Sequence, residues 1–142
     1  MEKDHYIGVD ISKRTIDVAI YVKNQEKKGT FPHETFSNSE DGFKDMKKWL
    51  RKQHVVLSKS LFCMEATGNY TYELCLFLEQ LGVAYSIQSP LHLKRSFGLT
   101  HGKNDKVDAS RIAYYAYLHR EDIKLSKLAS DSVRKLKALI AE

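Results

Sequence analysis

Four acidic residues have the types and positions that metal-assisted phosphoryl chemistry needs. Asp10 ends the apolar run YIGVD and Glu65 ends LFCME, both of which read as short buried strands. Asp105 and Asp108 are three residues apart in KNDKVDA, so they share one face of an expected helix. Unpaired charges are costly to bury, so acids in such places need partners. Four clustered carboxylates suit hard cations such as Mg²⁺ or Mn²⁺.

Two such cations, about 3.5–4 Å apart, can stabilise the attacking and leaving oxygens of an in-line displacement at phosphorus. A carboxylate shared between them must lie centrally, and we expect this to be Asp10, beside which Gly8 leaves room. Structural roles stay open: Asp10 and Glu65 could cap the segments that follow them, and the other two acids could stabilise a first helical turn. Asp17 also lies in a strand, but we interpret it as solvent-exposed.

The excess of positive over negative charge comes from one part of the chain. The net charge is +5, and residues 91–142, with 11 Lys/Arg against 6 Asp/Glu, supply all of it. A local basic surface is typical of polyphosphate-binding proteins, although a merely soluble lysine-rich face remains the alternative. The residues that we expect to contact nucleic acid are Lys13, Lys94, Arg95, Lys103, Lys106 and Arg111.

Other function classes find little support. Cys63 and Cys75 have no metal-binding or redox spacing, and we expect both in a reduced core. The six histidines form no metal-binding motif, and no glycine-rich nucleotide loop occurs. We find no secretory leader and no apolar run of about 18 residues, and therefore expect a cytoplasmic protein without a membrane partner. Tyr114, Tyr115 and Tyr117 are expected to pack in the core rather than stack on bases.

The elements that must position the acids follow from hydrophobic periodicity. We predict helices over 39–52, 70–81 and 105–119, the first capped by Ser39 and the second ended by Gly82. Pro32 favours an edge position for the third strand. The order βββαβαβα predicts an α/β, ribonuclease H-like fold, a mixed five-stranded sheet flanked by helices, with the fourth strand beside the first. The predicted strands are 5–11, 15–22, 30–37, 60–66 and 83–88.

A further helical pattern is expected from Ile123, with Val133, Leu136, Leu139 and Ile140 as an apolar stripe. The stripe runs to the end of the chain without a cap. We therefore expect a catalytic domain over residues 1–120, and over 121–142 the start of a helical linker or coiled coil towards a further C-terminal domain.

Three segments together resemble a known family: YIGVDISKRTIDVAI, MEATGNYTYELCLFLEQLGV and SPLHLKRSFGLTHGKNDKVDASRIAYYAY. They are similar to the N-terminal domain of the DEDD transposases, the insertion-sequence family that includes the Piv pilin-gene invertase. The catalytic domain of that family is like the RuvC Holliday-junction resolvase. The sequence differs from the usual pattern at Gln88–Pro90, where the family often has Asn-Pro, and at Asn104, where threonine is common.

The resemblance implies that Asp10, Glu65, Asp105 and Asp108 are the catalytic metal ligands, with two Mg²⁺ or Mn²⁺ ions. It implies transposition or site-specific recombination of bacterial DNA, with the protein on the nucleoid when bound. In some members a structured RNA guides the choice of target, and we expect a dimer or tetramer for the complete protein. Members also carry a C-terminal domain with a DNA-attacking serine, which these residues lack.

Three rival functions remain from the sequence. The first is a stand-alone structure-specific nuclease of Holliday-junction type, which would cleave branched DNA without RNA or a further domain. The second is a non-catalytic nucleic-acid-binding module, which would bind without metal and tolerate loss of Asp10. The third, an actin-like ATPase of related fold, lacks the glycine-rich phosphate turn, because Asp10 is followed by Ile-Ser-Lys.

Overall fold

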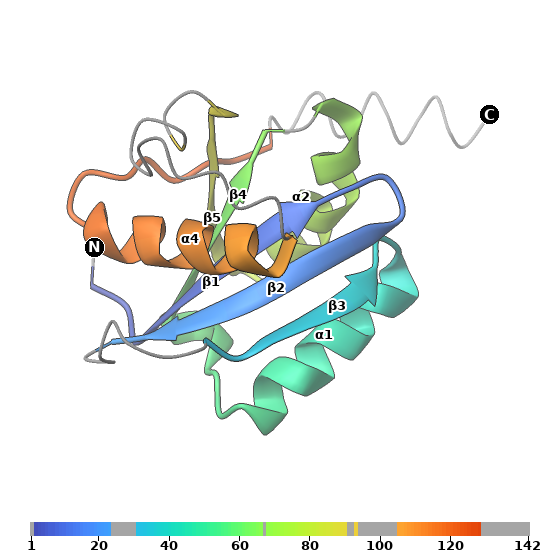
Figure 1. Cartoon of the computed structure of the whole chain (residues 1–142), viewed down its shortest axis with the longest axis horizontal. Helices are drawn as coiled ribbons and strands as arrows, with labels where there is room; N and C mark the ends of the chain where they lie inside the picture. The colour runs from blue at the N-terminus through green and yellow to red at the C-terminus, as the bar shows by residue number, and fades with distance from the viewer. Residues whose placement is uncertain (1, 24–30, 67, 91–92, 94–104, 129–142) are drawn as a thin grey trace.

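The structure is a computed structural model that describes residues 2–23, 31–66, 68–90, 93 and 105–128, with backbone only for residues 105–107. The predicted order βββαβαβα is confirmed, with short 3₁₀ turns at Leu57–Lys59 and Gly68–Thr71. The elements are β1 (His5–Ile11), β2 (Thr15–Val22), β3 (His33–Ser37), α1 (Glu40–Lys52), β4 (Ser60–Glu65), α2 (Tyr72–Gln80), β5 (Ala84–Gln88) and α4 (Asp105–Leu118) (Figure 1).

The five strands form one mixed sheet in the order β3-β2-β1-β4-β5. β1, β2 and β3 pair antiparallel as a meander, whereas β4 and β5 continue the sheet in parallel with β1. Parallel neighbours end at the same edge of a sheet. The carboxyl ends of β1, β4 and β5, which hold Asp10, Glu65 and Gln88, therefore lie side by side.

Local signals in the sequence explain the ends of the helices. The Ser39 hydroxyl accepts a hydrogen bond from the Gly42 amide at 3.3 Å, which confirms the predicted N-cap of α1. Gly82 has φ +70°, a conformation that glycine adopts at little cost, and it ends the turn after α2. Pro32 directly precedes β3, which is an edge strand as predicted.

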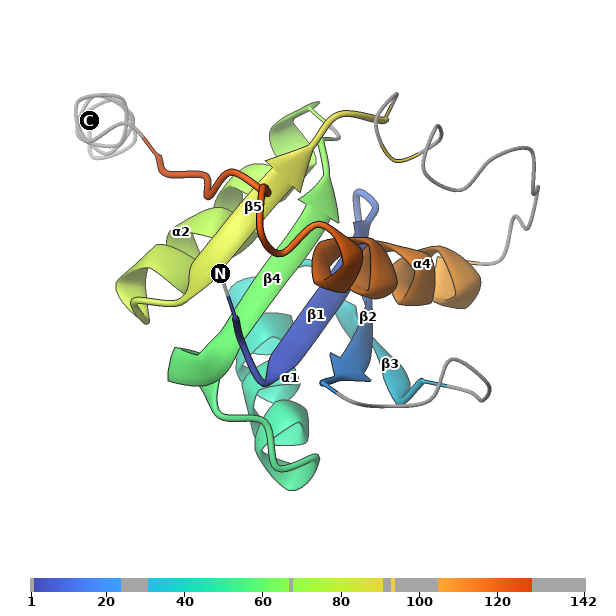
Figure 2. The same cartoon turned by 90° about the vertical axis from the view of Figure 1, so that its left-hand side faces the viewer.

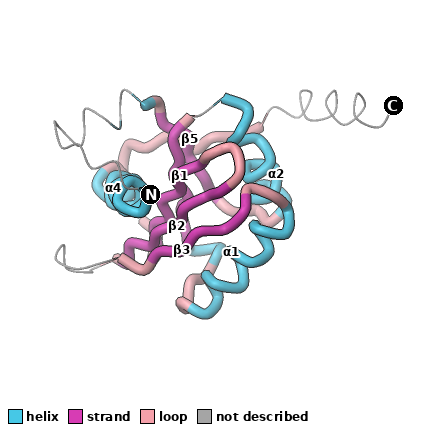
Figure 3. The backbone as a smooth tube through the Cα atoms, turned by 45° about the vertical axis from the view of Figure 1, so that its right-hand side comes forward, coloured by secondary structure: helices cyan, strands magenta, loops and turns pink. Residues whose placement is uncertain are grey.

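The sheet is the middle of three layers, with α4 on one face and α1 and α2 on the other (Figure 3). The α1/α2 face is buried under an apolar cluster that includes Ile7, Val9, Phe62 and Met64. A second buried cluster joins α4 to the opposite face through residues such as Tyr6, Cys63 and Ile112. Both faces of the central strands are thus covered, which is why β1 and β4 are almost continuously apolar.

Gly8 allows the backbone of α4 to lie directly against β1. A Cβ atom built at Gly8 would lie 2.1 Å from the Ala109 carbonyl oxygen and 2.3 Å from the Ala113 amide nitrogen. Ala109 and Ala113 are themselves fully buried. Small residues on both partners therefore fix where α4 crosses the sheet, and with it the placement of the acids on α4.

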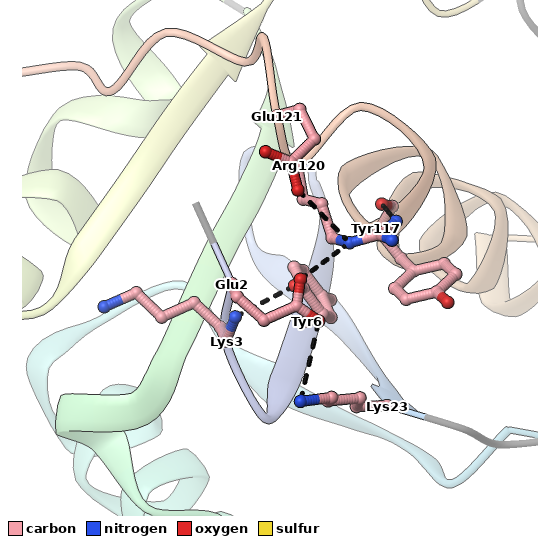
Figure 4. Close-up of polar contacts among 7 residues, drawn as sticks. All are labelled: Glu2, Lys3, Tyr6, Lys23, Tyr117, Arg120 and Glu121. Carbon is pink, nitrogen blue, oxygen red and sulfur yellow. Dashed lines mark hydrogen bonds and ion pairs between the residues drawn. The ribbon is translucent and has the colours of Figure 1, made fainter.

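The C-terminal end of α4 is held by a cluster of ionic and aromatic contacts (Figure 4). The Arg120 guanidinium donates to the Glu2 carboxylate at 2.9 Å and lies 4.3 Å from the centre of the Tyr117 ring. The ammonium group of Lys23 lies 3.6 Å from the same carboxylate. The hydrogen bond from Arg120 is the main reason that the pKa of Glu2 is lowered. This cluster ties the end of α4 to the start of β1 and the end of β2.

Residues 121–128, called the edge segment below, leave α4 and run along β5 (Figure 2). The Ser126 amide donates to the Tyr85 carbonyl at 2.8 Å, and the Ile87 amide donates to the Ser126 hydroxyl at 2.8 Å. The prediction of a helix from Ile123 is wrong for 123–128, because these residues bond to the exposed edge of β5 instead. Val133, Leu136, Leu139 and Ile140 lie outside the described residues, and the boundary at residue 120 stays a prediction.

Candidate active site

The strand register places five polar residues at one height across the α4 face of the sheet. Asp10 pairs with Asp17 on β2, and Asp17 pairs with Thr35 on β3. The parallel register of β1 with β4, in which Val9 pairs with Met64, continues to put Asp10 level with Glu65. Glu65 in turn pairs with Gln88 on β5. This polar row consists of Thr35, Asp17, Asp10, Glu65 and Gln88.

The two rows next to it on the same face are quite different. One row consists mainly of small side chains, and the one after it is aromatic and apolar over most of its length. A carboxylate in either row would lie beneath the packed part of α4. The acids are therefore confined to the edge of the sheet at which β1, β4 and β5 end. The small row is Ala19, Gly8, Cys63 and Ser86, with His33 on β3, and the apolar row is Tyr21, Tyr6, Leu61 and Ala84.

Asp108 lies on the side of α4 that faces the polar row. Two helical turns separate it from Tyr115, so the two residues lie on nearly the same side of the helix. The Tyr115 hydroxyl donates to the side-chain oxygen of Gln88 at 3.1 Å, which fixes that side towards the polar row. Tyr117, in contrast, contacts Tyr6 and Tyr21 in the apolar row, with ring centres 5.4 and 4.6 Å apart.

The strand register and the direction of α4 thus bring Asp10, Glu65 and Asp108 to the same end of the α4 face. Asp10, Glu65 and Asp108 are each partly exposed. Asp105 begins α4, but its side chain is not described. Among the described side chains, no group of three or more His, Cys, Asp or Glu residues is arranged as a metal site. The four-carboxylate site therefore stays a prediction.

The structure also overturns the sequence interpretation of Asp17. Its side chain is only 7% exposed rather than solvated, and its carboxylate accepts a hydrogen bond from the Thr35 hydroxyl. The reason is that both faces of β2 are covered, so the side opposite Ile16 and Val18 is buried too. Ala19 and Tyr21, which alternate with Asp17 along β2, carried this signal in the sequence.

Asn38 is a residue that sequence reasoning missed altogether. Its side-chain amide donates to the carbonyl of Ser12 at 2.9 Å and to that of Tyr70 at 3.1 Å. Ser12 follows Asp10 and β1, and Tyr70 lies in the turn after β4 and Glu65. Asn38 therefore links the two turns that directly follow acids of the polar row. Its partners are 26 and 32 residues away, so no local motif could reveal the link.

Gln88 belongs to a chain of hydrogen bonds that joins α4 to β5 and the edge segment. Besides accepting from Tyr115, its amide donates to the Ser86 hydroxyl at 2.7 Å. Ser86 in turn donates to the Lys124 carbonyl at 2.6 Å. A hollow of about 460 Å³ opens beside this chain, lined in part by Ser89 and by residues of α4 and the edge segment.

Two buried groups on the α4 face are chemically inert. Burial raises the pKa of the Cys63 thiol to about 12, so this residue is a protonated core side chain, as expected from the sequence. Burial also raises the pKa of Tyr115, with smaller contributions from Cys63 and Asp122. Tyr115 therefore stays a neutral hydrogen-bond donor to Gln88. The tyrosine cluster packs against the sheet, which agrees with the predicted core role.

The expected nucleic-acid contacts are only partly within the described residues. Lys13 is exposed in the β1–β2 turn, three residues after Asp10, and Arg111 is half-buried on α4. Lys94, Arg95 and Lys103 lie outside the described residues, as does the side chain of Lys106. In the part of the chain that the structure describes, no helix has both the length and the apolar character needed to cross a membrane.

Comparison with known proteins gives matches in sequence over almost the whole chain. A family model described as a transposase, of the DEDD type of the IS110 elements, matches residues 7–142. The pilin gene-inverting proteins of Moraxella bovis and Moraxella lacunata are each 32% identical over 140 residues. These alignments cover 96% of this chain but 41% of each relative, so the chain spans less than half their length.

Solved structures show the same fold. RuvC of Thermus thermophilus in complex with a Holliday junction substrate has a TM-score of 0.62 at 10% identity. A second Thermus thermophilus RuvC structure has a TM-score of 0.56 at 12% identity. Each comparison covers 86% of this chain and 99% of the solved chain. The predicted ribonuclease H-like, RuvC-like fold is therefore confirmed.

Proposed function

Because the chain belongs to the DEDD transposase family of the IS110 type, we propose that it is the catalytic domain of a DNA transposase or site-specific recombinase. In this proposal it cleaves phosphodiester bonds and transfers the strands with the help of divalent cations. The observation that carries the proposal is the polar row, which brings Asp10 and Glu65 to the sheet edge towards which Asp108 faces.

The donor set at this edge fits Mg²⁺ or Mn²⁺. Carboxylates offer hard oxygen atoms, and they come here from separate elements, β1, β4 and α4, whose packing is fixed by Gly8. We propose that Asp10, Glu65, Asp105 and Asp108 hold the cations, with Asp10 in the shared central position. Two bound cations would supply stabilisation of charge on the attacking and leaving oxygens at phosphorus.

The remaining residues bind and position the DNA in this proposal. Lys13 extends from the turn beside Asp10, and Arg111 follows Asp108 by one helical turn, so both lie where backbone phosphates would pass. The proposal also includes Lys94, Arg95, Lys103 and Lys106, which belong to the basic part of the sequence. The hollow beside Gln88 gives further space for substrate atoms at the other end of the row.

The partners follow from the family resemblance and are part of the proposal. DNA is the substrate, and the protein works in the bacterial cytoplasm on the nucleoid. A structured guide RNA and a dimeric or tetrameric assembly are expected of the complete protein. The chain spans 41% of the length of its relatives, and complete recombination would need further residues beside these.

Calorimetric titration of Mn²⁺ into the chain tests the proposal. The chain should bind Mn²⁺ saturably, and Asp10→Asn should remove this binding while circular dichroism and the melting temperature show an intact fold. Asp45→Asn is the matched control, because Asp45 is an exposed acid on α1, on the opposite face of the sheet. It should bind Mn²⁺ like the unchanged chain. Equal binding by the Asp10→Asn variant would contradict the assignment and favour a non-catalytic binding module.

A further inference from the structure

Asp17 lies next to another acid, an arrangement that a purely structural role does not explain. It lies directly opposite Asp10 in the antiparallel β1–β2 pair, so both side chains project from the same face of the sheet. Side chains in such directly opposed positions have Cβ atoms about 4.5–5.5 Å apart. Like charges there destabilise a strand pair. Asp10 and Asp17 nevertheless lie directly opposite each other, in spite of this cost.

Burial makes this arrangement more costly at Asp17 than at an exposed position. The side chain is 93% buried, and among the described residues it accepts a hydrogen bond from the Thr35 hydroxyl, a neutral donor. A buried carboxylate is normally compensated by a positive charge, because desolvation of the ionised group is expensive. One neutral hydroxyl does not supply that charge.

None of the described ion pairs gives Asp17 a positive partner, and a cation bound at the neighbouring acids would supply such a charge. We propose that Asp17 is a fifth acidic residue of the site, which acts through Asp10 by adding negative charge beside it and so raises the affinity for the divalent cation. This inference rests on the proposed function. Like charges in directly opposed positions disfavour a strand pair, and a bound cation would offset that penalty. The low effective dielectric around the buried Asp17 side chain strengthens the effect.

Thr35 has a separate, structural task in this arrangement. Its hydroxyl holds the Asp17 carboxylate from β3, in the strand pair on the other side of β2 from Asp10. The hydrogen bond fixes the orientation of the acid but carries no net charge. The charge of Asp17 and its hydrogen bond can therefore be removed one at a time.

Two variants separate the roles. Asp17→Asn removes the charge and keeps an oxygen that can accept from Thr35, whereas Thr35→Val removes the hydrogen bond and keeps the charge. Mn²⁺ affinity by calorimetry should fall roughly 10- to 100-fold for Asp17→Asn, the usual cost of losing a supporting residue of a metal site. The affinity of Thr35→Val should stay within about threefold of the unchanged chain, well below that range.

The melting temperature without Mn²⁺ is a second measurement, and the two roles predict changes of opposite sign. Loss of a repelling charge should keep or raise it, whereas loss of a structural residue should lower it. Without Mn²⁺, Asp17→Asn should melt at or above the temperature of the unchanged chain, and added Mn²⁺ should raise it less. Thr35→Val should melt lower without Mn²⁺ and gain the normal increment. If Asp17→Asn instead melts lower and binds Mn²⁺ like the unchanged chain, Asp17 is only structural and the inference fails. Failure of the proposed function looks different, because Asp10→Asn would then bind Mn²⁺ normally.

Discussion

The two faces of the central sheet serve different purposes. On the α1/α2 face, aliphatic and aromatic side chains continue to the ends of the strands, as with Ile11 and Met64. On the α4 face, β1 changes from apolar to small to polar within five residues, from Tyr6 through Gly8 to Asp10. The α1/α2 face thus stabilises the fold by apolar burial along the whole length of the strands, whereas the α4 face gives up part of this burial to hold acids.

The largest expected effect is on the α1/α2 face. Phe62→Ala removes a fully buried ring and leaves a cavity, so the free energy of unfolding should fall by about 3–5 kcal/mol. Because the side chain points away from the polar row, Mn²⁺ affinity of the folded fraction should not change. Denaturant unfolding and calorimetry measure the two quantities. Lost affinity in the folded protein would show that the faces are not independent.

The next largest effect is at Gly8, whose contact with α4 affects both the stability of the fold and the position of Asp108. Gly8→Ala forces α4 away from β1, so the free energy of unfolding should fall by about 1–3 kcal/mol. Because this displaces Asp108, the affinity for Mn²⁺ should fall as well. Gly42→Ala is the matched control, because Gly42 lies in α1, on the other face of the sheet from α4. A Cβ atom at Gly42 would lie 1.8 Å from the Ser37 carbonyl oxygen, so this variant is overpacked as well. It should lower stability and leave Mn²⁺ affinity intact. Equal affinity losses in both variants would indicate general unfolding.

The smallest effect concerns the hydrogen bond that fixes the side of α4 facing the polar row. Tyr115→Phe keeps the ring but removes the donor to Gln88, so stability should fall by about 1 kcal/mol. Thermal unfolding with a Tyr114→Phe control measures this, because Tyr114 contacts Tyr21 from the other side of α4. An unchanged melting temperature for Tyr115→Phe would mean that Gln88 finds another donor.

Most of the fold could be predicted from the sequence because its signals are local. The apolar run of β1, the alternation in β2, the cap at Ser39 and the stop at Gly82 each determine an element within a few residues. The positions of β4 and α4 beside β1 followed from topology rules for such element orders. The elements that surround Asp10 could therefore be predicted from the sequence, although the contacts of individual side chains could not.

What the sequence did not reveal depends on contacts between distant segments. The burial of Asp17 requires α4, whose first residue is 88 positions further along the chain, to cover its face of β2. The edge segment contains residues that suit a helix, but the exposed groups of β5 offer hydrogen bonds that a helix would leave unmade. Asn38 likewise acts on two remote turns. Tertiary partners outweighed local propensity in each case.

The edge segment also limits how copies of the protein can associate. An uncovered outer strand invites pairing with another chain, which leads to sheet extension or aggregation. Here the Tyr85 carbonyl and the Ile87 amide of β5 are already engaged by Ser126. The opposite outer strand, β3, is short and follows Pro32. Copies of the chain that associate would therefore meet through side-chain surfaces, and continuous intermolecular sheets are disfavoured at both borders.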